Sequence, residues 1–169
     1  QQLIREGQVR QYGAVVEDEE KAVLIGGRRD SPNQVRTSHG RGEVYHTTVF
    51  AKLVGLALLK FATLDPLGMG IEMEAGKPAW YDALNGLPGL LGSSLSETYE
   101  LERLLSLLLE VTVEKGEQRV DLPVEQADLM QQVVEALQSW CQSDDADRDF
   151  QYWNVVSTAR ETYRARVRL

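Results

Sequence analysis

Residues 47–64 read TTVFAKLVGLALLKFATL, and this stretch decides the fold class of the chain. Its apolar side chains recur at helical spacing and leave almost no polar face, which is typical of a helix that is buried on all sides. The sequence Asp65-Pro66 ends the pattern, because proline disfavours the helical conformation of the residue before it. We therefore predict a buried helix over residues 47–64.

The same periodicity predicts three further helices towards the C-terminus. Residues 96–111 are again apolar on nearly every side, whereas residues 122–142 and the stretch from residue 150 onwards each carry one apolar stripe. Two helices buried all round and two amphipathic helices fit an inner and an outer helical layer, whereas every helix of a simple four-helix bundle keeps one wet face. The pattern predicts a mainly α fold that forms part of an α/α toroid.

The N-terminal part of the chain has weaker signals. Two short apolar runs, residues 14–16 and 22–25, flank an acidic stretch and predict a β-hairpin. A long loop follows over residues 26–45, and a glycine-rich loop over residues 66–95 separates the two most apolar helices. We expect these loops to gather at one end of the helices and to form a site there.

Composition and charge narrow the class of protein. The chain has 169 residues and a net charge of −8, from 18 lysines and arginines against 26 aspartates and glutamates, which argues against nucleic acid as the main partner. A single cysteine excludes a disulfide framework, and with only two histidines we expect no metal and no cofactor. The longest apolar run is too short to span a bilayer, so we expect a cytoplasmic protein without a membrane partner.

The length fits one domain, which we divide into a loop- and hairpin-rich part, residues 1–45, and a helical part, residues 46–169. The chain begins with Gln1 rather than with methionine, and it stops at Leu169 inside a predicted helix. We therefore interpret it as a fragment of a larger catalytic domain. Its candidate protein partners are the remainder of a longer chain and a second copy of itself.

The densest group of reactive side chains lies in the second loop, where residues 72–86 read EMEAGKPAWYDALNG. Aromatic rings stack on the apolar face of a pyranose, and polar groups beside them take its hydroxyls. Asp82 can protonate a glycosidic oxygen if apolar neighbours raise its pKa. The sequence therefore indicates a carbohydrate site with Asp82 as the catalytic residue. The candidate substrate contacts are Glu74, Lys77, Trp80, Tyr81, Asn85 and Glu97.

The sequence WYDALNG at residues 80–86 resembles the Trp-Asn-Asp-Gly-Met-Asn signature of cellobiose phosphorylase and related inverting glycoside phosphorylases. The likeness covers residues 76–105 and includes Glu97, which follows a glycine-rich loop and opens an apolar helix, as a glutamate of that family does. Tyr81 stands where the family has asparagine, and residues 77–79 stand where it has Gly-Asp. With these departures, the resemblance is to a side branch of the family.

The resemblance implies an (α/α)6 catalytic barrel, of which this chain would hold a part. It also implies that Asp82 is the general acid and that Trp80 and Asn85 lie in the sugar site. The substrate would be a disaccharide or an oligosaccharide. Inorganic phosphate would be the nucleophile and co-substrate, so that no catalytic base is required.

The residues of the second loop also have structural interpretations. An aspartate such as Asp82 often caps a turn or the start of a helix, and Glu97 has the spacing of a capping-box partner to Ser94. Glu74 is either a surface glutamate or the second carboxylate of inverting hydrolysis, which requires the two groups to be about 6.5–9.5 Å apart. Phosphorolysis and inverting hydrolysis both stay open. So does a non-catalytic helical domain that binds sugar or another protein through residues 66–95.

The first loop holds a second candidate site. Guanidinium groups clamp phosphate through paired hydrogen bonds, and this loop is rich in arginine. Arg36, His39 and Arg41 are the candidate phosphate ligands, and a phosphorylase needs such an anion pocket. The alternative is a solvated basic loop that balances the charge of an acidic domain.

Overall fold

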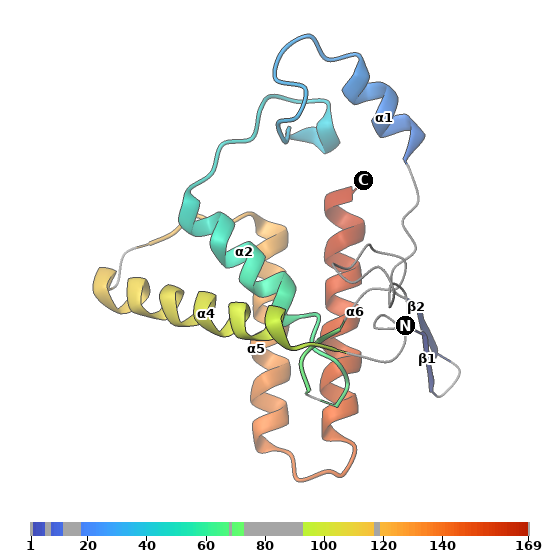
Figure 1. Ribbon diagram of the computed structural model, residues 1–169, viewed down its shortest axis with the longest axis vertical. Helices are drawn as coiled ribbons and strands as arrows, with labels where there is room; N and C mark the ends of the chain where they lie inside the picture. The colour runs from blue at the N-terminus through green and yellow to red at the C-terminus, as the bar shows by residue number, and fades with distance from the viewer. Residues whose placement is uncertain are drawn as a thin grey trace.

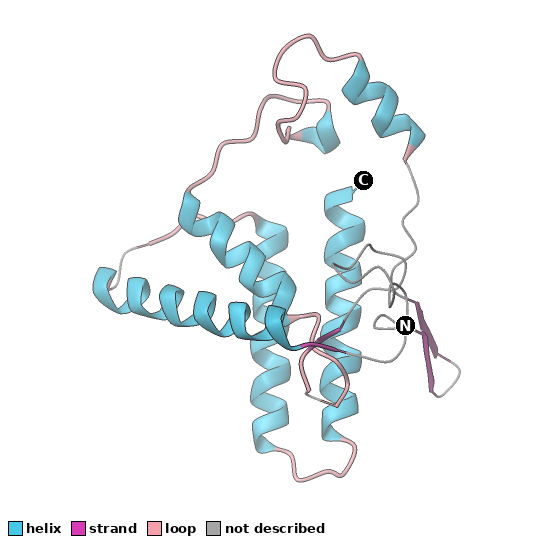
Figure 2. Cartoon of the chain, in the orientation of Figure 1, coloured by secondary structure: helices cyan, strands magenta, loops and turns pink. Residues whose placement is uncertain are grey.

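The computed structural model describes residues 2–5, 8–11, 18–67, 69–72, 93–116 and 119–168, and over these residues the protein is mainly helical (Figures 1 and 2). The predicted fold class is therefore confirmed at this level. The elements are β1 (Gln2–Arg5), β2 (Gln8–Gln11), α1 (Glu19–Gly26), the 3-10 helix η1 (Ser38–Gly40), α2 (Val49–Phe61), β3 (Ile71–Glu72), β4 (Ser93–Ser94), α4 (Leu95–Lys115), α5 (Val124–Gln142) and α6 (Arg148–Arg168).

The helix predicted over residues 47–64 is α2, which begins two residues later and ends three residues earlier than predicted. Thr48 is its N-cap, and the Thr48 hydroxyl accepts a hydrogen bond of 3.1 Å from the N–H of Ala51. Ala62 is the C-cap. After the helix has ended, Leu64 forms an antiparallel bridge with Ile71.

The core of the described residues consists of two clusters. In the first, α2, α5 and α6 meet, and α5 and α6 pack as an antiparallel pair (Figure 1). In the second, α4 packs on α2 together with the first residue of β3. The buried members of the first cluster are Leu58, Ala62, Leu129, Val133, Ala136, Val156 and Ala159, and those of the second are Ala57, Ile71, Leu101 and Leu108.

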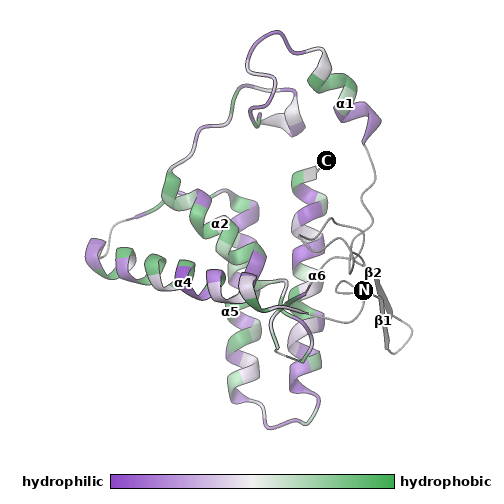
Figure 3. Cartoon of the chain, viewed as in Figure 1, coloured by the Kyte–Doolittle hydropathy of each residue, from purple (hydrophilic) through white to green (hydrophobic). Residues whose placement is uncertain are grey.

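The prediction that two helices are buried on all sides is wrong for the chain as the structure describes it. In α4 only Leu101 and Leu108 are buried, whereas Tyr99 and Leu109 are both 65% exposed. The reason is geometric, because α4 packs on α2 with one face, while its remaining apolar side chains lie on other sides of the helix. Figure 3 shows how hydrophobic residues are distributed over α2 and α4.

The N-terminal prediction was also wrong in part. Residues 22–25 belong to α1 and form no strand, and residues 14–16 lie outside the described residues. Asp18 accepts a hydrogen bond from the N–H of Lys21, and two glutamates occupy the first turn, where the helix dipole favours negative charge. This N-terminal capping outweighs the strand preference of the apolar run. An antiparallel hairpin does exist, but β1 and β2 form it, with Gln2 opposite Gln11.

No helix among the described segments is both long enough and apolar enough to cross a bilayer.

Candidate functional site

Most of the predicted carbohydrate site lies outside the described residues. This applies to Glu74, Lys77, Trp80, Tyr81, Asp82 and Asn85. The structure does describe the base from which their segment leaves the helical body. At this base, β3 and β4 pair in antiparallel fashion, with Ile71 opposite Ser94 and Glu72 opposite Ser93. Glu72 and Ser93, which flank residues 73–92 in the sequence, are therefore held next to each other.

The first residues of α4 fix this base from one side. The Thr98 hydroxyl accepts a hydrogen bond of 3.0 Å from the N–H of Ile71 and donates one of 2.7 Å to the carbonyl of Ser94. Gly70 permits this close approach, because a Cβ at this position would lie 2.8 Å from the Thr98 Oγ1.

Asp65 fixes the base from the other side, and the sequence interpretation missed this role. One carboxylate oxygen of Asp65 accepts hydrogen bonds from the N–H groups of Leu67 and Met69, at 2.7 and 3.3 Å. The other oxygen accepts a hydrogen bond of 2.7 Å from the Ser93 hydroxyl. The sequence contained a signal for this role, since an aspartate directly before proline is typical of a residue that organises a turn.

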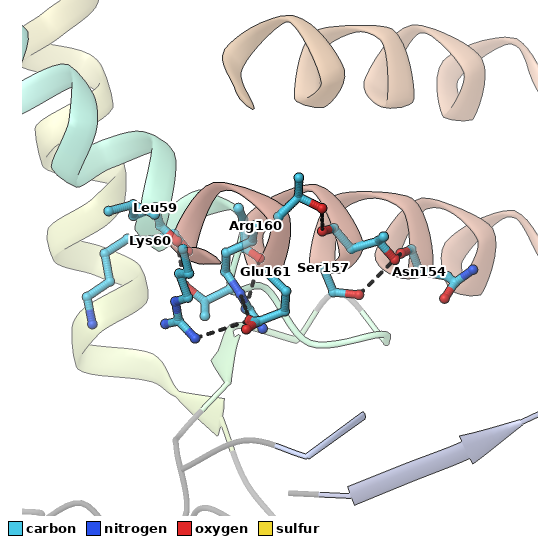
Figure 4. A network of polar contacts seen from close by, with 11 residues as sticks. Leu59, Lys60, Asn154, Ser157, Arg160 and Glu161 are labelled. Atoms are coloured by element: carbon cyan, nitrogen blue, oxygen red, sulfur yellow. Dashed lines mark hydrogen bonds and ion pairs between the residues drawn. The ribbon is translucent and has the colours of Figure 1, made fainter. Parts of the chain in front are cut away.

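A group of buried polar side chains lies where the C-terminal end of α2 meets α6 (Figure 4). The Arg160 side chain of α6 is fully buried, and its Nη1 donates a hydrogen bond of 3.0 Å to the carbonyl of Ala62. The neighbouring carbonyl, that of Thr63, accepts one of 2.7 Å from the N–H of Glu72, whose side chain is also buried. One turn after α2 thus connects α6 with the base of residues 73–92.

Arg160 occupies a place where a cation is favourable. The carbonyl groups at the end of a helix carry partial negative charge, and Ala62 is the C-cap of α2. Its position in the C-terminal half of α6 would by itself suggest only that Arg160 complements the dipole of its own helix. The overlooked signal was register, because Arg160 follows Val156 by four residues and so shares the buried face of α6.

Glu97 is the one predicted carbohydrate contact that the structure describes. Its N–H donates a hydrogen bond of 3.3 Å to the Ser94 hydroxyl, so the N-cap half of the predicted capping box is confirmed. Its carboxylate forms an ion pair of 2.5 Å with Lys60 near the end of α2, and both side chains are about half exposed. Glu97 therefore lies beside the base of residues 73–92, and its contact with a substrate stays a prediction.

The arginines of the first loop bind the loop's own backbone. Arg36 donates hydrogen bonds to the carbonyls of Gly42 and Asp30, at 3.2 and 3.0 Å. Arg28 donates in the same way to three carbonyls of the loop, including that of Gly40 at 2.7 Å. These bonds give both side chains a structural role.

The other two predicted phosphate ligands, His39 and Arg41, lie at the surface. His39 has a left-handed backbone conformation with φ 53°, and its carbonyl accepts a hydrogen bond from Lys21. The three predicted ligands thus differ in solvent exposure. Arg36 is half-buried and donates a hydrogen bond to the carbonyl of Gly42 within the loop, whereas His39 and Arg41 are exposed. Phosphate binding by Arg36, His39 and Arg41 stays a prediction.

Tyr152 of α6 gives a prediction about alkaline pH. This side chain packs against the first core cluster, and burial raises its pKa from 10.0 to about 12. The phenol therefore contributes stability that is complete below pH 10 and is lost as the pH rises towards 12. We expect the free energy of unfolding of Tyr152→Phe to fall less between pH 10 and pH 12 than that of the unsubstituted protein. Urea unfolding at a series of pH values measures this free energy.

The matched control for this prediction is Tyr99→Phe, because Tyr99 is largely exposed. The control should lose stability with pH as the unsubstituted protein does. An identical pH dependence for Tyr152→Phe and the unsubstituted protein would contradict the prediction.

Within the described part of the chain, no group of three His, Cys, Asp or Glu side chains is placed to hold a metal ion. No protein-family model, curated protein or solved structure matches this chain. The resemblance to inverting glycoside phosphorylases therefore depends on the motif at residues 80–86 and on the sequence around it.

Proposed function

We propose that the chain is part of a carbohydrate-active enzyme of the (α/α)6 type. It would cleave or form glycosidic bonds in a disaccharide or oligosaccharide, by phosphorolysis or by inverting hydrolysis. Asp82 would be the general acid, with Trp80 and Asn85 in the sugar site. The proposal combines the motif at residues 80–86 with one structural observation, namely the paired base at β3 and β4.

The paired base supports the proposal because proton transfer requires accurate placement of the donor. A general acid acts within hydrogen-bond reach of the leaving oxygen, and an error of about 1 Å costs a large factor in rate. The anchors of the base come from three directions, namely Asp65 in the turn, Thr98 in α4 and the carbonyl of Thr63 after α2. The segment with the motif thus begins and ends on firmly held residues.

The side chains around the base also suit a polar substrate. Lys60 and Glu97 offer a cation and a carboxylate at the surface beside β4, and both are accessible to solvent. Such a pair can exchange its mutual ion pair for hydrogen bonds to sugar hydroxyls at little cost, because exposed ion pairs contribute about 0–1 kcal/mol. This supports Glu97 as a substrate contact in the proposed site.

A phosphate-dependence assay tests the proposal and separates its two forms. The chain is incubated with cellobiose, laminaribiose, maltose or trehalose, with and without inorganic phosphate. Release of a sugar 1-phosphate that requires phosphate is the expected result for a phosphorylase, and phosphate-independent release of free sugar is the result for a hydrolase. Absence of both products with every disaccharide would contradict the enzymatic proposal.

A second candidate function is supported by the exposed apolar side chains of α4. Leu95, Tyr99, Leu109 and Val113 are all more than 60% exposed, and their spacing places them on one side of the helix. Exposed apolar side chains that lie together on one side of a helix are typical of a protein-binding surface. Under this alternative the chain is a non-catalytic helical domain, and no disaccharide is turned over with or without phosphate.

A further inference from the structure

The exposed side of α4 follows a heptad repeat. Its residues are separated alternately by four and three positions, which is the spacing of the seam between two helices of a coiled coil. The residues of this seam, all of them exposed, are Leu95, Tyr99, Glu102, Ser106, Leu109 and Val113. The packing of α4 on α2 uses the other side of the helix, with Leu101 and Leu108. In Figure 1, α4 extends beyond the end of α2 at one edge of the described helices.

The order of residues along the seam is symmetric. Read from either end, it is apolar, apolar, polar, polar, apolar, apolar. If two copies of α4 lie antiparallel, with a two-fold axis at the level of residue 104, then Leu95 faces the partner's Val113 and Tyr99 faces the partner's Leu109. The Tyr99 ring can cover that leucine while its hydroxyl stays in water at the edge of the seam. Every apolar residue of the seam thus meets another apolar residue.

The polar residues of the seam select the same arrangement. In the antiparallel pair Glu102 faces the partner's Ser106, whose hydroxyl can donate a hydrogen bond to the carboxylate. A parallel pair would place Glu102 against the partner's Glu102, and like charges in close contact are unfavourable. Shifting the antiparallel pair by one heptad would place Glu102 against the partner's Tyr99. At the rim, Arg103 and Glu110 lie on one flank of the seam, so the antiparallel pair brings these opposite charges together.

The exposed apolar surface of α4 is large enough for a dimer. The exposed fractions of Leu95, Tyr99, Leu105, Leu109 and Val113 range from 40% to 74%. Together they correspond to about 500–600 Å² on each copy, or about 1,000–1,200 Å² in the pair, and a specific interface needs about 1,000 Å². Leu105 adds to this area because it flanks the seam close to the two-fold axis, where it lies beside its own copy.

We propose that α4 is the interface of an antiparallel homodimer, with a second copy of this chain as the occupant of its exposed side. An interface between identical copies related by a two-fold axis must be self-complementary, and the symmetric order of the seam meets this condition. The proposal does not depend on the carbohydrate site, and turnover of a disaccharide neither supports nor contradicts it. It accounts for the exposed apolar side chains of α4 without a foreign partner.

Leu109→Glu tests the proposal, and Leu107→Glu is its matched control. Leu107 lies on the same helix and is 48% exposed, but it is outside the seam. Sedimentation equilibrium of the full chain should give twice the 19.0 kDa of one chain for the unsubstituted protein and for the control. For Leu109→Glu we expect the dissociation constant of the dimer to rise at least about 100-fold, because symmetry places the new charge at two points of the seam.

Ser106→Glu is a second variant that keeps the helix, since glutamate is a good helix former. It places a carboxylate opposite the partner's Glu102, again at two points of the seam. We expect the dissociation constant to rise at least about tenfold. Circular dichroism checks that each variant retains its helical content.

Disulfide cross-linking tests the orientation of the two helices. Leu95→Cys and Val113→Cys are prepared as separate proteins, each with Cys141→Ser to remove the natural thiol. In the antiparallel dimer a cysteine at 95 faces one at 113, within the Cα separation of about 4.4–6.8 Å that a disulfide allows. The two copies of position 95 are about 27 Å apart. Oxidation should therefore give a covalent dimer in the mixture and in neither protein alone.

Each of these measurements can overturn the proposal. An unsubstituted protein that is monomeric at every concentration contradicts it, and so does a dimer that survives both Leu109→Glu and Ser106→Glu. Equal dissociation of Leu109→Glu and Leu107→Glu would mean that the seam is not the interface. Cross-linking of either single cysteine variant with itself would contradict the antiparallel arrangement.

Discussion

Asp82→Asn is expected to abolish most of the turnover while sugar binding is retained. A general acid contributes about 10²–10⁴-fold to the rate, and an amide of the same shape cannot donate a proton to the glycosidic oxygen. The hydrogen bonds of an amide to sugar hydroxyls are similar to those of a carboxyl group. We therefore expect kcat to fall by about 10²–10⁴-fold. Release of sugar 1-phosphate or free sugar measures turnover, and titration calorimetry with the same disaccharide measures binding.

Asp144→Asn is the matched control, because it makes the same chemical change at an exposed position in the turn between α5 and α6. The control should turn over the disaccharide at the rate of the unsubstituted protein. Equal rates for Asp82→Asn, the control and the unsubstituted protein would remove Asp82 from the mechanism. A parallel loss of binding and turnover would instead assign Asp82 to sugar binding.

The helical part of the fold was predictable because the apolar periodicity of its helices extends over many residues. Over about twenty residues, as in α5 and α6, the apolar period is repeated often enough to identify a helix and its buried face. The burial of α4 on all sides was not predictable in the same way. Apolar content shows that a surface can be buried, but which neighbour covers it depends on the tertiary arrangement. In the described chain α4 packs on α2 with one face only.

The short N-terminal elements show more clearly that a sequence pattern of only a few residues is a poor predictor of secondary structure. The run at residues 22–25 has the composition of a strand, yet a single aspartate cap and two glutamates turn it into the helix α1. A signal of four residues is thus overruled by its immediate neighbours. The same argument explains why β1 and β2 were missed, since strands of four residues carry too few alternations to stand out.

In the site, sequence reasoning found groups that act locally and missed those that act across the fold. Glu97 was recognised as a capping partner of Ser94, three residues away, and this bond is present. Arg160 and Ala62 are 98 residues apart, and no local pattern announces their hydrogen bond. Arg36 was a candidate phosphate ligand because arginine suits phosphate, and its hydrogen bonds to two backbone carbonyls of the loop were not predicted.

Ile71→Ala is expected to have the largest effect on stability among substitutions near the base. Ile71 is 1% exposed and packs in the second core cluster with Ala57, Leu101 and Leu108. Its truncation removes buried methyl groups and leaves a cavity between α2 and α4, which costs about 2–5 kcal/mol for isoleucine to alanine. Urea unfolding followed by circular dichroism measures the loss in the free energy of unfolding.

Met69→Ala is the control for this prediction, because Met69 lies two residues away with 68% of its surface exposed. The control should change the free energy of unfolding by less than about 0.5 kcal/mol, as is usual for surface substitutions. A loss below about 1 kcal/mol for Ile71→Ala would mean that β3 contributes little to the core. The base would then lack the firm attachment that the proposed site requires. A large loss instead shows that β3 is anchored in the same core that holds α2 and α4 together.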